Sequence, residues 1–240
     1  MIIGPIYRLT LRALLLQRRT ILLVLLALAP VLVAFIYAVA AKQGAHHLRF
    51  YSHMMQELFV PTIAAVVALV IGVSALGDER EDGTIYYLVA TPQSRLGLIV
   101  TKVAAAWTAT LLLLVPSVVV SALLILKGGV DASSILWPVA GVALATLAYC
   151  GVAGWLSLRT RRPIVIGVLY ILLWEGSIAT YAASADRLSI AAYGRALAAE
   201  RLPEAAAAVV SPAVATVVLA AAAVGLAMLG SRAMRQADLP

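Results

Sequence analysis

Six runs of apolar residues, each about 20 residues long, divide this sequence and limit what it can fold into. A helix of that length crosses the hydrocarbon core of a bilayer and bonds every backbone N–H and C=O within itself. With 63% hydrophobic and 12% charged residues, the chain has the composition of an integral membrane protein. We therefore predict an all-α integral membrane protein with six transmembrane helices in a single domain, 1–240. The predicted spans are 20–41, 58–76, 103–126, 135–158, 163–183 and 212–230.

An amphipathic segment, 1–19, precedes the first span. Its apolar and basic residues fall on opposite sides of a helix, which predicts an elbow helix lying in the membrane interface with its cations near lipid headgroups. The apolar side carries Tyr7, Leu11, Leu14 and Leu15, and the basic side carries Arg8, Arg12 and Arg19. Membrane anchoring and contact with a partner protein are both compatible with this pattern.

The basic residues are unevenly divided between the two sides of the predicted membrane. Twelve of the 18 lysines and arginines lie on the side of the N-terminus, and six lie on the other side. Because loops rich in Lys and Arg stay in the cytoplasm, both termini and the connection 77–102 are predicted to be cytoplasmic. The net charge of +7 then serves orientation and lipid binding, and a nucleic-acid partner is not expected.

The connection between the second and third spans, Gly77–Lys102, reads GDEREDGTIYYLVATPQSRLGLIVTK. Gly83 can end the charged helix that leaves the membrane, and Thr84 can cap a short helix, Ile85–Ala90. Thr91 and Pro92 form a second helix start. The sequence therefore predicts a short helix lying crosswise between two long ones, although a solvated loop is the alternative.

This connection also resembles the first cytoplasmic loop of ABC-2 type permeases, through the pattern E-x-E-x-G-T-x-x-x-L-x-x-x-P-x-S-R followed by a lysine. The resemblance implies that the short helix is a coupling helix held in a groove of a separate ABC ATPase. Tyr86 and Tyr87 would face that partner, since amphipathic tyrosines are common at interface hot spots. The matching residues are Glu79, Glu81, Gly83, Thr84, Leu88, Pro92, Ser94, Arg95 and Lys102.

The family resemblance implies a permease subunit of an exporter, paired with a second copy or a paralogue and with two copies of the ATPase. ATP and Mg²⁺ would bind the ATPase and no cofactor would bind this chain, which has no G-x-x-x-x-G-K-[ST] motif and is not expected to be an enzyme. Abundant Ala, Val, Leu and Arg suggest a bacterial source, and hence the plasma membrane. The alternatives are a membrane scaffold that docks a cytoplasmic protein and a secondary transporter that uses Glu175.

Glu175 is the acidic residue inside a predicted span, twelve residues after Pro163. A charge at that depth costs about 2.5–3.5 kcal/mol on insertion scales, so it is expected to face the protein interior or a wet cavity. Together with Trp174, it is a candidate for lining the transport pathway. A structural hydrogen bond to Ser177, Thr180 or a neighbouring span is the alternative.

Two further segments lie on the outer side. In the connection 42–57, His46, His53 and Glu57 would share one face of a helix, but their spacing matches no familiar metal site, so metal binding is the less favoured interpretation. The segment 184–211 is too polar to span the membrane, yet it contains enough apolar residues to stay close to it. We interpret it as a re-entrant helix, with an interfacial helix as the alternative.

Overall fold

The computed structural model describes residues 4–41, 46–81, 95–127, 131–178, 188–200, 202 and 210–236, except for the side chains at 78–81, 95, 177–178 and 233–236. The regular elements within these residues are all helices. Two of them, η1 and η2, are π-helical, with backbone bonds that reach five residues along the chain. In chain order the helices are α1 (Gly4–Leu16), α2 (Arg18–Ala40), α3 (His47–His53), η1 (Met54–Ala64), α4 (Ala65–Glu81), α6 (Arg95–Leu126), α7 (Ser133–Arg159), α8 (Pro163–Leu169), η2 (Tyr170–Ile178), α10 (Ile190–Ala198) and α11 (Pro212–Gln236).

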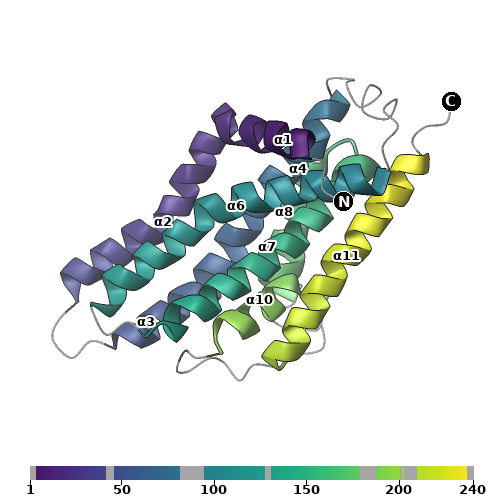
Figure 1. Ribbon diagram of the computed structural model, residues 1–240. Helices are drawn as coiled ribbons and strands as arrows, with labels where there is room; N and C mark the ends of the chain where they lie inside the picture. Colours follow the sequence, from purple (N-terminus) through teal and green to yellow (C-terminus); the bar gives the residue numbers. More distant parts are fainter. Residues whose placement is uncertain are drawn as a thin grey trace.

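The long helices lie side by side in one bundle, with α1 lying across one end (Figure 1). The C-terminal end of α11 lies at the same end as α1, and α3 and α10 lie at the opposite end. Helix α7 is central, since it packs against α4, α6, α10 and α11. The fold therefore brings the segments flanking the connection 77–102 to one end and the short helix α10 to the other.

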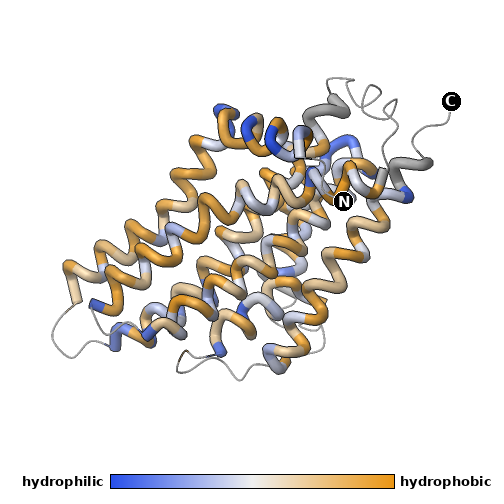
Figure 2. The backbone as a smooth tube through the Cα atoms, viewed as in Figure 1, coloured by the Kyte–Doolittle hydropathy of each residue, from blue (hydrophilic) through white to orange (hydrophobic). Residues whose placement is uncertain are grey.

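Five helical segments in the described part of the chain are long and apolar enough to cross a membrane. Apolar residues cover most of their length, and polar residues gather on α1 and near the helix ends (Figure 2). The predicted fifth span corresponds to a shorter apolar stretch, Pro163–Gly176, within α8 and η2, and residues 179–183 lie outside the described part. The five long segments are Arg18–Ala40, His47–Gly77, Leu96–Leu126, Ser133–Arg159 and Pro212–Arg232.

The continuous helical stretch that contains the predicted second span, 58–76, begins before that span. Residues from His47 onward are helical, whereas we expected a connection as far as Glu57. This stretch is amphipathic: Tyr51 and Met55 are fully buried, and His53 and Glu57 are exposed. The polar residues lower its average hydropathy without interrupting the helix, which is why the boundary was placed too late.

Within the segment 1–19 the structure has the helix α1, and the chain bends at Gln17 before α2 begins. Gln17 has an extended backbone conformation, with φ −68° and ψ 143°. The buried Thr20 hydroxyl donates to the Leu14 carbonyl at 2.5 Å across the bend. Tyr7 and Thr108 share a hydroxyl–hydroxyl hydrogen bond of 2.9 Å, which ties α1 to α6.

Small residues on α7 allow close helix packing. A Cβ atom at Gly141 would lie 2.6 Å from the Gly194 carbonyl oxygen of α10. One at Gly154 would lie 3.1 Å from Leu76 of α4, and one at Gly151 would lie 3.2 Å from Leu226 of α11. At these three glycines α7 lies so close to α10, α4 and α11 that an added Cβ would crowd an atom of the neighbouring helix.

Candidate pathway and coupling sites

The described residues contain the two helices that flank the predicted coupling segment. Helix α4 continues to Glu81, and α6 begins at Arg95. The backbone of Glu79, Glu81 and Arg95 is therefore helical, as expected. The other predicted coupling residues, Gly83, Thr84, Tyr86, Tyr87, Leu88 and Pro92, lie outside the described residues.

A buried lysine connects these two flanking helices. The Lys102 side chain on α6 is fully buried, and its Nζ donates a hydrogen bond of 3.1 Å to the Ala75 carbonyl oxygen on α4. A charge-assisted bond of this kind is stronger than a bond between neutral groups. Although the sequence pattern included Lys102, its burial was not predicted. The position of Lys102 within an apolar stretch of the sequence could have indicated that its side chain is buried.

Glu175 lies inside the bundle, with 3% of its surface exposed. It projects from η2, and its carboxylate accepts five hydrogen bonds from α7, from the start of α10 and from η2 itself, so it belongs to a closed polar site. Trp174, its neighbour, is half-buried. The five donors are the Tyr149 hydroxyl (2.7 Å), the Tyr170 hydroxyl (3.0 Å), the Ser189 hydroxyl (3.3 Å), and the backbone N–H groups of Ile190 (3.1 Å) and Ala191 (2.9 Å).

Two of these donors belong to the first turn of α10. The first N–H groups of any α-helix have no partner within the helix, and a negative charge there also interacts favourably with the helix dipole. Ser189 is the N-cap, and its side chain accepts from the Ala192 N–H at 3.1 Å. Glu175 and Ser189 together therefore satisfy the first turn of α10 from outside the helix.

This arrangement resolves part of the expectation for Glu175. The predicted interior position is observed, and so is a bond to a neighbouring span, through Tyr149 of α7. The bond to α10 was not predicted, because Ser189 and Glu175 are separated by 14 residues and by a polar stretch. The Ser177 side chain and Thr180, the other predicted partners, lie outside the description.

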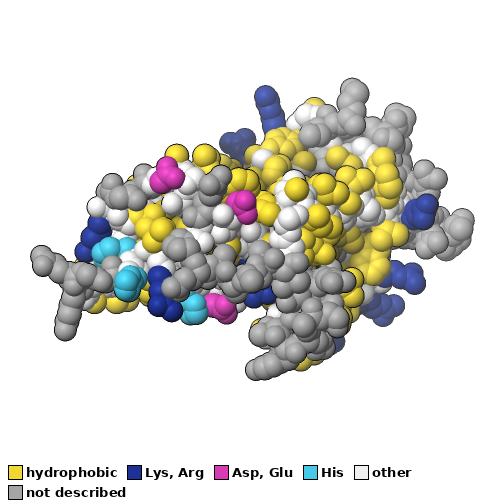
Figure 3. Space-filling view, turned by 90° about the horizontal axis from the view of Figure 1, so that it is seen from below, with side chains coloured by type: hydrophobic (Ala, Val, Ile, Leu, Met, Phe, Trp, Pro, Cys, Tyr) yellow, Lys and Arg dark blue, Asp and Glu magenta, His cyan; other side chains and the backbone are white. Residues whose placement is uncertain are grey.

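One of the three histidines, His47, packs against an aromatic ring. The His47 ring meets Tyr37 edge-on at 5.7 Å between centroids, and Tyr37 stacks on Phe50 at 3.8 Å. His46, His53 and Glu57 are exposed, and histidine side chains are visible at one end of the face seen from below (Figure 3). Among the described residues, no three His, Cys, Asp or Glu side chains are grouped as a metal site would require.

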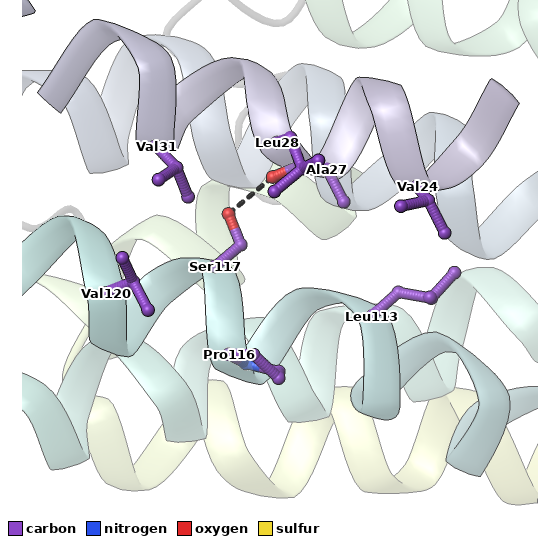
Figure 4. Close-up of a pocket in the computed structure, with 8 residues that line it drawn as sticks. All are labelled: Val24, Ala27, Leu28, Val31, Leu113, Pro116, Ser117 and Val120. Carbon is purple, nitrogen blue, oxygen red and sulfur yellow. Dashed lines mark hydrogen bonds between the residues drawn. The ribbon is translucent and has the colours of Figure 1, made fainter. Parts of the chain in front are cut away.

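An apolar hollow of about 130 Å³ lies between α2 and α6. Val24 and Val31 of α2 point toward α6, and the Ser117 hydroxyl donates to the Ala27 carbonyl at 2.5 Å (Figure 4). Its lining contains no titratable side chain, so it offers no acid–base or ion-binding chemistry.

The helical bundle and its long apolar helices define a multi-pass membrane protein. The sequence profile described as ABC-2 family transporter protein matches residues 15–185, and the chain belongs to this family. It is therefore a permease component of an ABC transporter, a class that works in association with an ABC ATPase component. No curated protein sequence matches the chain.

Proposed function

We propose that this chain is the permease subunit of an ABC exporter in the bacterial plasma membrane. Two permease subunits, identical or paralogous, form the pathway, and two copies of the ATPase bind on the cytoplasmic side with ATP and Mg²⁺. The observation that carries the proposal is the family match over residues 15–185, which includes the connection 77–102. Two-fold symmetry is the usual way for such a half-pathway to be completed.

In this proposal, the connection 77–102 transmits movement of the ATPase to the permease. The sequence pattern from Glu79 to Arg95 supports a coupling helix at 83–90. The Lys102–Ala75 hydrogen bond supports joint movement, since it joins α4 to α6 just beyond the connection. A push on the coupling helix would then reach the second and third spans together.

The proposed orientation places α1 and both termini in the cytoplasm. It rests on the twelve-to-six division of basic residues. The bundle agrees with this arrangement in one respect: α1 and the C-terminal end of α11 lie at the same end, away from α10 (Figure 1). The segment 184–211 would then lie on the outer side, where we propose that α10 is re-entrant.

The surroundings of Glu175 favour this proposal over a proton-driven secondary transporter. A proton site needs access to water, whereas Glu175 is buried and its carboxylate is surrounded by five donors from the protein. A scaffold without transport activity uses the same docking surface as a permease, so experiment has to separate these two functions.

The proposal predicts that an ABC ATPase co-purifies with the tagged chain from its own membrane. In that complex, Gly83→Pro, which breaks the predicted coupling helix, should lower ATP hydrolysis by at least about fivefold, the size of a typical coupling between sites. Tyr86→Ala should act in the same direction. Asp131→Ala, an exposed change just before the start of α7, is the control and should leave hydrolysis unchanged.

Three outcomes would contradict the proposal. If no ABC ATPase were present in the purified assembly, the proposed transporter would have no subunit to hydrolyse ATP. Hydrolysis that is unaffected by both coupling variants would favour a scaffold. Uptake driven by a pH gradient without ATP, and lost in Glu175→Gln, would favour a secondary transporter.

A further inference from the structure

The hollow between α2 and α6 has a buried floor and an exposed apolar rim. Ala27 and Ser117 form the floor, with 3% and 4% of their surfaces exposed, and the hydrogen bond between them joins the two helices there. On the rim, Val24, Leu28 and Val120 are 37%, 49% and 40% exposed (Figure 4). Because this rim lies on the exposed surface of a membrane-spanning bundle, the hollow opens toward the surrounding lipid.

The shape of the hollow follows from the sequence of α2. Residues 24, 27, 28 and 31 recur at i, i+3, i+4 and i+7, which places them on one face of the helix, toward α6. The small Ala27 lies in the middle of this face and lets the Ser117 hydroxyl reach its carbonyl oxygen at 2.5 Å. The larger Val24 and Val31 lie about one turn to either side of it. A groove with a shallow polar contact at its floor and apolar walls therefore runs between the two helices.

The size of the hollow limits what can fill it. Its volume is about 130 Å³, and the two helices are already in contact at its floor. A helix, which is about 10–12 Å wide with its side chains, is too thick to enter. Water does not occupy the hydrocarbon core, and an empty hollow would deprive its lining of dispersion contacts. A single flexible hydrocarbon chain has the thickness and the polarity that the hollow accepts.

The hollow lies at the depth of an acyl chain whose headgroup is beside α1. Val24 and Val31 follow the start of α2 by six and thirteen residues, or about 9 and 20 Å at about 1.5 Å per residue. Leu113 and Val120 follow Thr108, which bonds to α1, by five and twelve residues, or about 8 and 18 Å. One leaflet fills about half of the hydrocarbon core, or about 15 Å. Both helices therefore place the hollow within the leaflet on the side of α1.

Helix α1 bridges α2 and α6 at the headgroup end of this groove. Its C-terminal end leads into α2 through the bend at Gln17, and Tyr7 bonds to Thr108 of α6. Arg8 and Arg12 lie between these two attachments and are exposed, and polar residues gather on α1 in Figure 2. Basic side chains at a bilayer surface attract anionic headgroups. The basic helix and the apolar groove together match the two parts of an anionic phospholipid.

From this arrangement we propose that α1, α2 and α6 form a binding site for one anionic phospholipid. One acyl chain lies in the hollow over Ala27 and Ser117, and the headgroup phosphate meets Arg8 and Arg12. The lipid thereby joins α1 to the groove that α1 bridges. This inference goes beyond the proposed function, because it requires only that the bundle lies in a bilayer, and it holds for either orientation of α1.

Photo-crosslinking tests whether an acyl chain occupies the hollow. The whole chain is reconstituted in phosphatidylcholine vesicles with a trace of phosphatidylglycerol that carries a diazirine on one acyl chain. Peptide mapping then compares labelling at 24–31 and 113–120 with labelling at Val217 and Val224, on an exposed apolar part of α11. We expect at least about fivefold more labelling in the hollow, as a modest preference in binding free energy produces. Equal labelling of the two surfaces would overturn the site.

Filling the hollow should displace the lipid. Val24→Phe places a larger side chain in it and should lower labelling of 113–120 at least about fivefold. Leu25→Phe, at a position that is 60% exposed and outside the lining, is the matched control and should leave labelling unchanged. If Val24→Phe does not accumulate, Val120→Phe, with labelling measured at 24–31, gives the same test from the other helix. Unchanged labelling, with or without loss of self-association, would overturn the proposal, and with such a loss it would assign the hollow to a contact between copies.

The headgroup is tested by competition with unlabelled lipid. Phosphatidylglycerol should suppress labelling of the hollow more strongly than phosphatidylcholine with the same acyl chains. Replacing Arg8 and Arg12 by glutamine should reduce this advantage at least about fivefold, the effect of about one surface cation. Arg161 and Arg162, exposed in the loop after α7, are replaced by glutamine as the control and should leave the advantage unchanged. Equal competition by the two lipids in the original chain, or an equal effect of both pairs of substitutions, would refute a headgroup site on α1.

Discussion

Lys102 and Glu175 are two ionisable side chains buried in the same apolar bundle, and the backbone solvates them in opposite ways. The Lys102 ammonium donates to the Ala75 carbonyl, which lies inside a continuous helix. That carbonyl already has a partner in the helical hydrogen-bond ladder. The Glu175 carboxylate accepts from the first N–H groups of α10, which have no partner within their helix.

Lys102 and Glu175 differ in which neighbouring groups lose a hydrogen-bond partner when the side chain is removed. Removing Lys102 leaves the Ala75 carbonyl with its helical bond. Removing Glu175 leaves two backbone N–H groups and two tyrosine hydroxyls without this acceptor, in a region that water does not reach. A buried polar group without a partner costs about 1–3 kcal/mol. Glu175 and α10 therefore depend on each other, whereas α4 does not depend on Lys102 to the same degree.

The largest effect is expected for Glu175→Met. Removing the carboxylate leaves several buried donors without this acceptor, at about 1–3 kcal/mol each, so the free energy of unfolding should fall by at least about 3 kcal/mol. Thermal unfolding of the purified protein in detergent measures the change. Glu57→Met, at an exposed glutamate, is the control and should stay within about 0.5 kcal/mol of the original. Equal stability of the two variants would show that α10 does not depend on Glu175.

The next effect concerns the close contact between α7 and α10. Gly141→Ala introduces a Cβ at 2.6 Å from a backbone oxygen of α10, and such overpacking should cost about 1–3 kcal/mol. Gly225→Ala provides a matched control on α11, since nothing lies within 4 Å of its added Cβ. The control should be neutral or stabilising by up to about 1 kcal/mol. If both variants unfold at the same temperature, α7 and α10 are not in close contact in the native protein.

A smaller effect is expected for Ser189→Ala. This change removes the N-cap acceptor for the Ala192 N–H and one of the five donors to Glu175, but it leaves the carboxylate in place. Loss of an N-cap costs about 1 kcal/mol. The same thermal unfolding assay, with Ser133→Ala at the start of α7 as control, checks the value. A loss as large as that of Glu175→Met would place the cap, rather than the carboxylate, at the centre of the site.

The smallest change in stability is expected for Lys102→Met. Methionine has a similar length, and the Ala75 carbonyl keeps its bond within α4, so we expect a change of about 1 kcal/mol or less, the size of one net hydrogen bond. The difference between the unfolding free energies of this variant and of Glu175→Met is the most direct test of whether the two buried side chains differ in importance. A loss at position 102 that equals the loss at position 175 would mean that the two buried charges are equally essential.

The sequence predicted those features of the fold that depend on local pattern. Apolar run lengths predicted the five long apolar helices in the described part of the chain, whereas the fifth predicted span corresponds there to the shorter stretch Pro163–Gly176. The helical stretch that contains the predicted second span extends back to His47, and this extension is amphipathic, with His53 and Glu57 on the exposed side. The π-helical form of η1 and η2 has no signature in composition or spacing.

The candidate site depends on pairs of residues that are far apart in the sequence. Glu175 was identified from the cost of burying a charge, but its partner Tyr149 lies 26 residues away on another span. The burial of Lys102 likewise depends on where α4 packs against α6, since its acceptor is 27 residues away. Hydropathy identifies a charge that needs a partner, and only the packing of the helices identifies that partner.

The π-helical segment η1 also affects how this chain tolerates changes of length. Deleting one residue from an ordinary α-helix turns everything beyond the deletion by about 100° around the helix axis. A π-helical segment has more residues per turn than an α-helix. Shortening it can therefore restore α-helical geometry without rotating the helix beyond it. Between Met54 and Ala64, the chain can therefore lose about two residues while Gly72 continues to face α7. Natural length variation among relatives is expected to concentrate in this segment, and not in α4 beyond it.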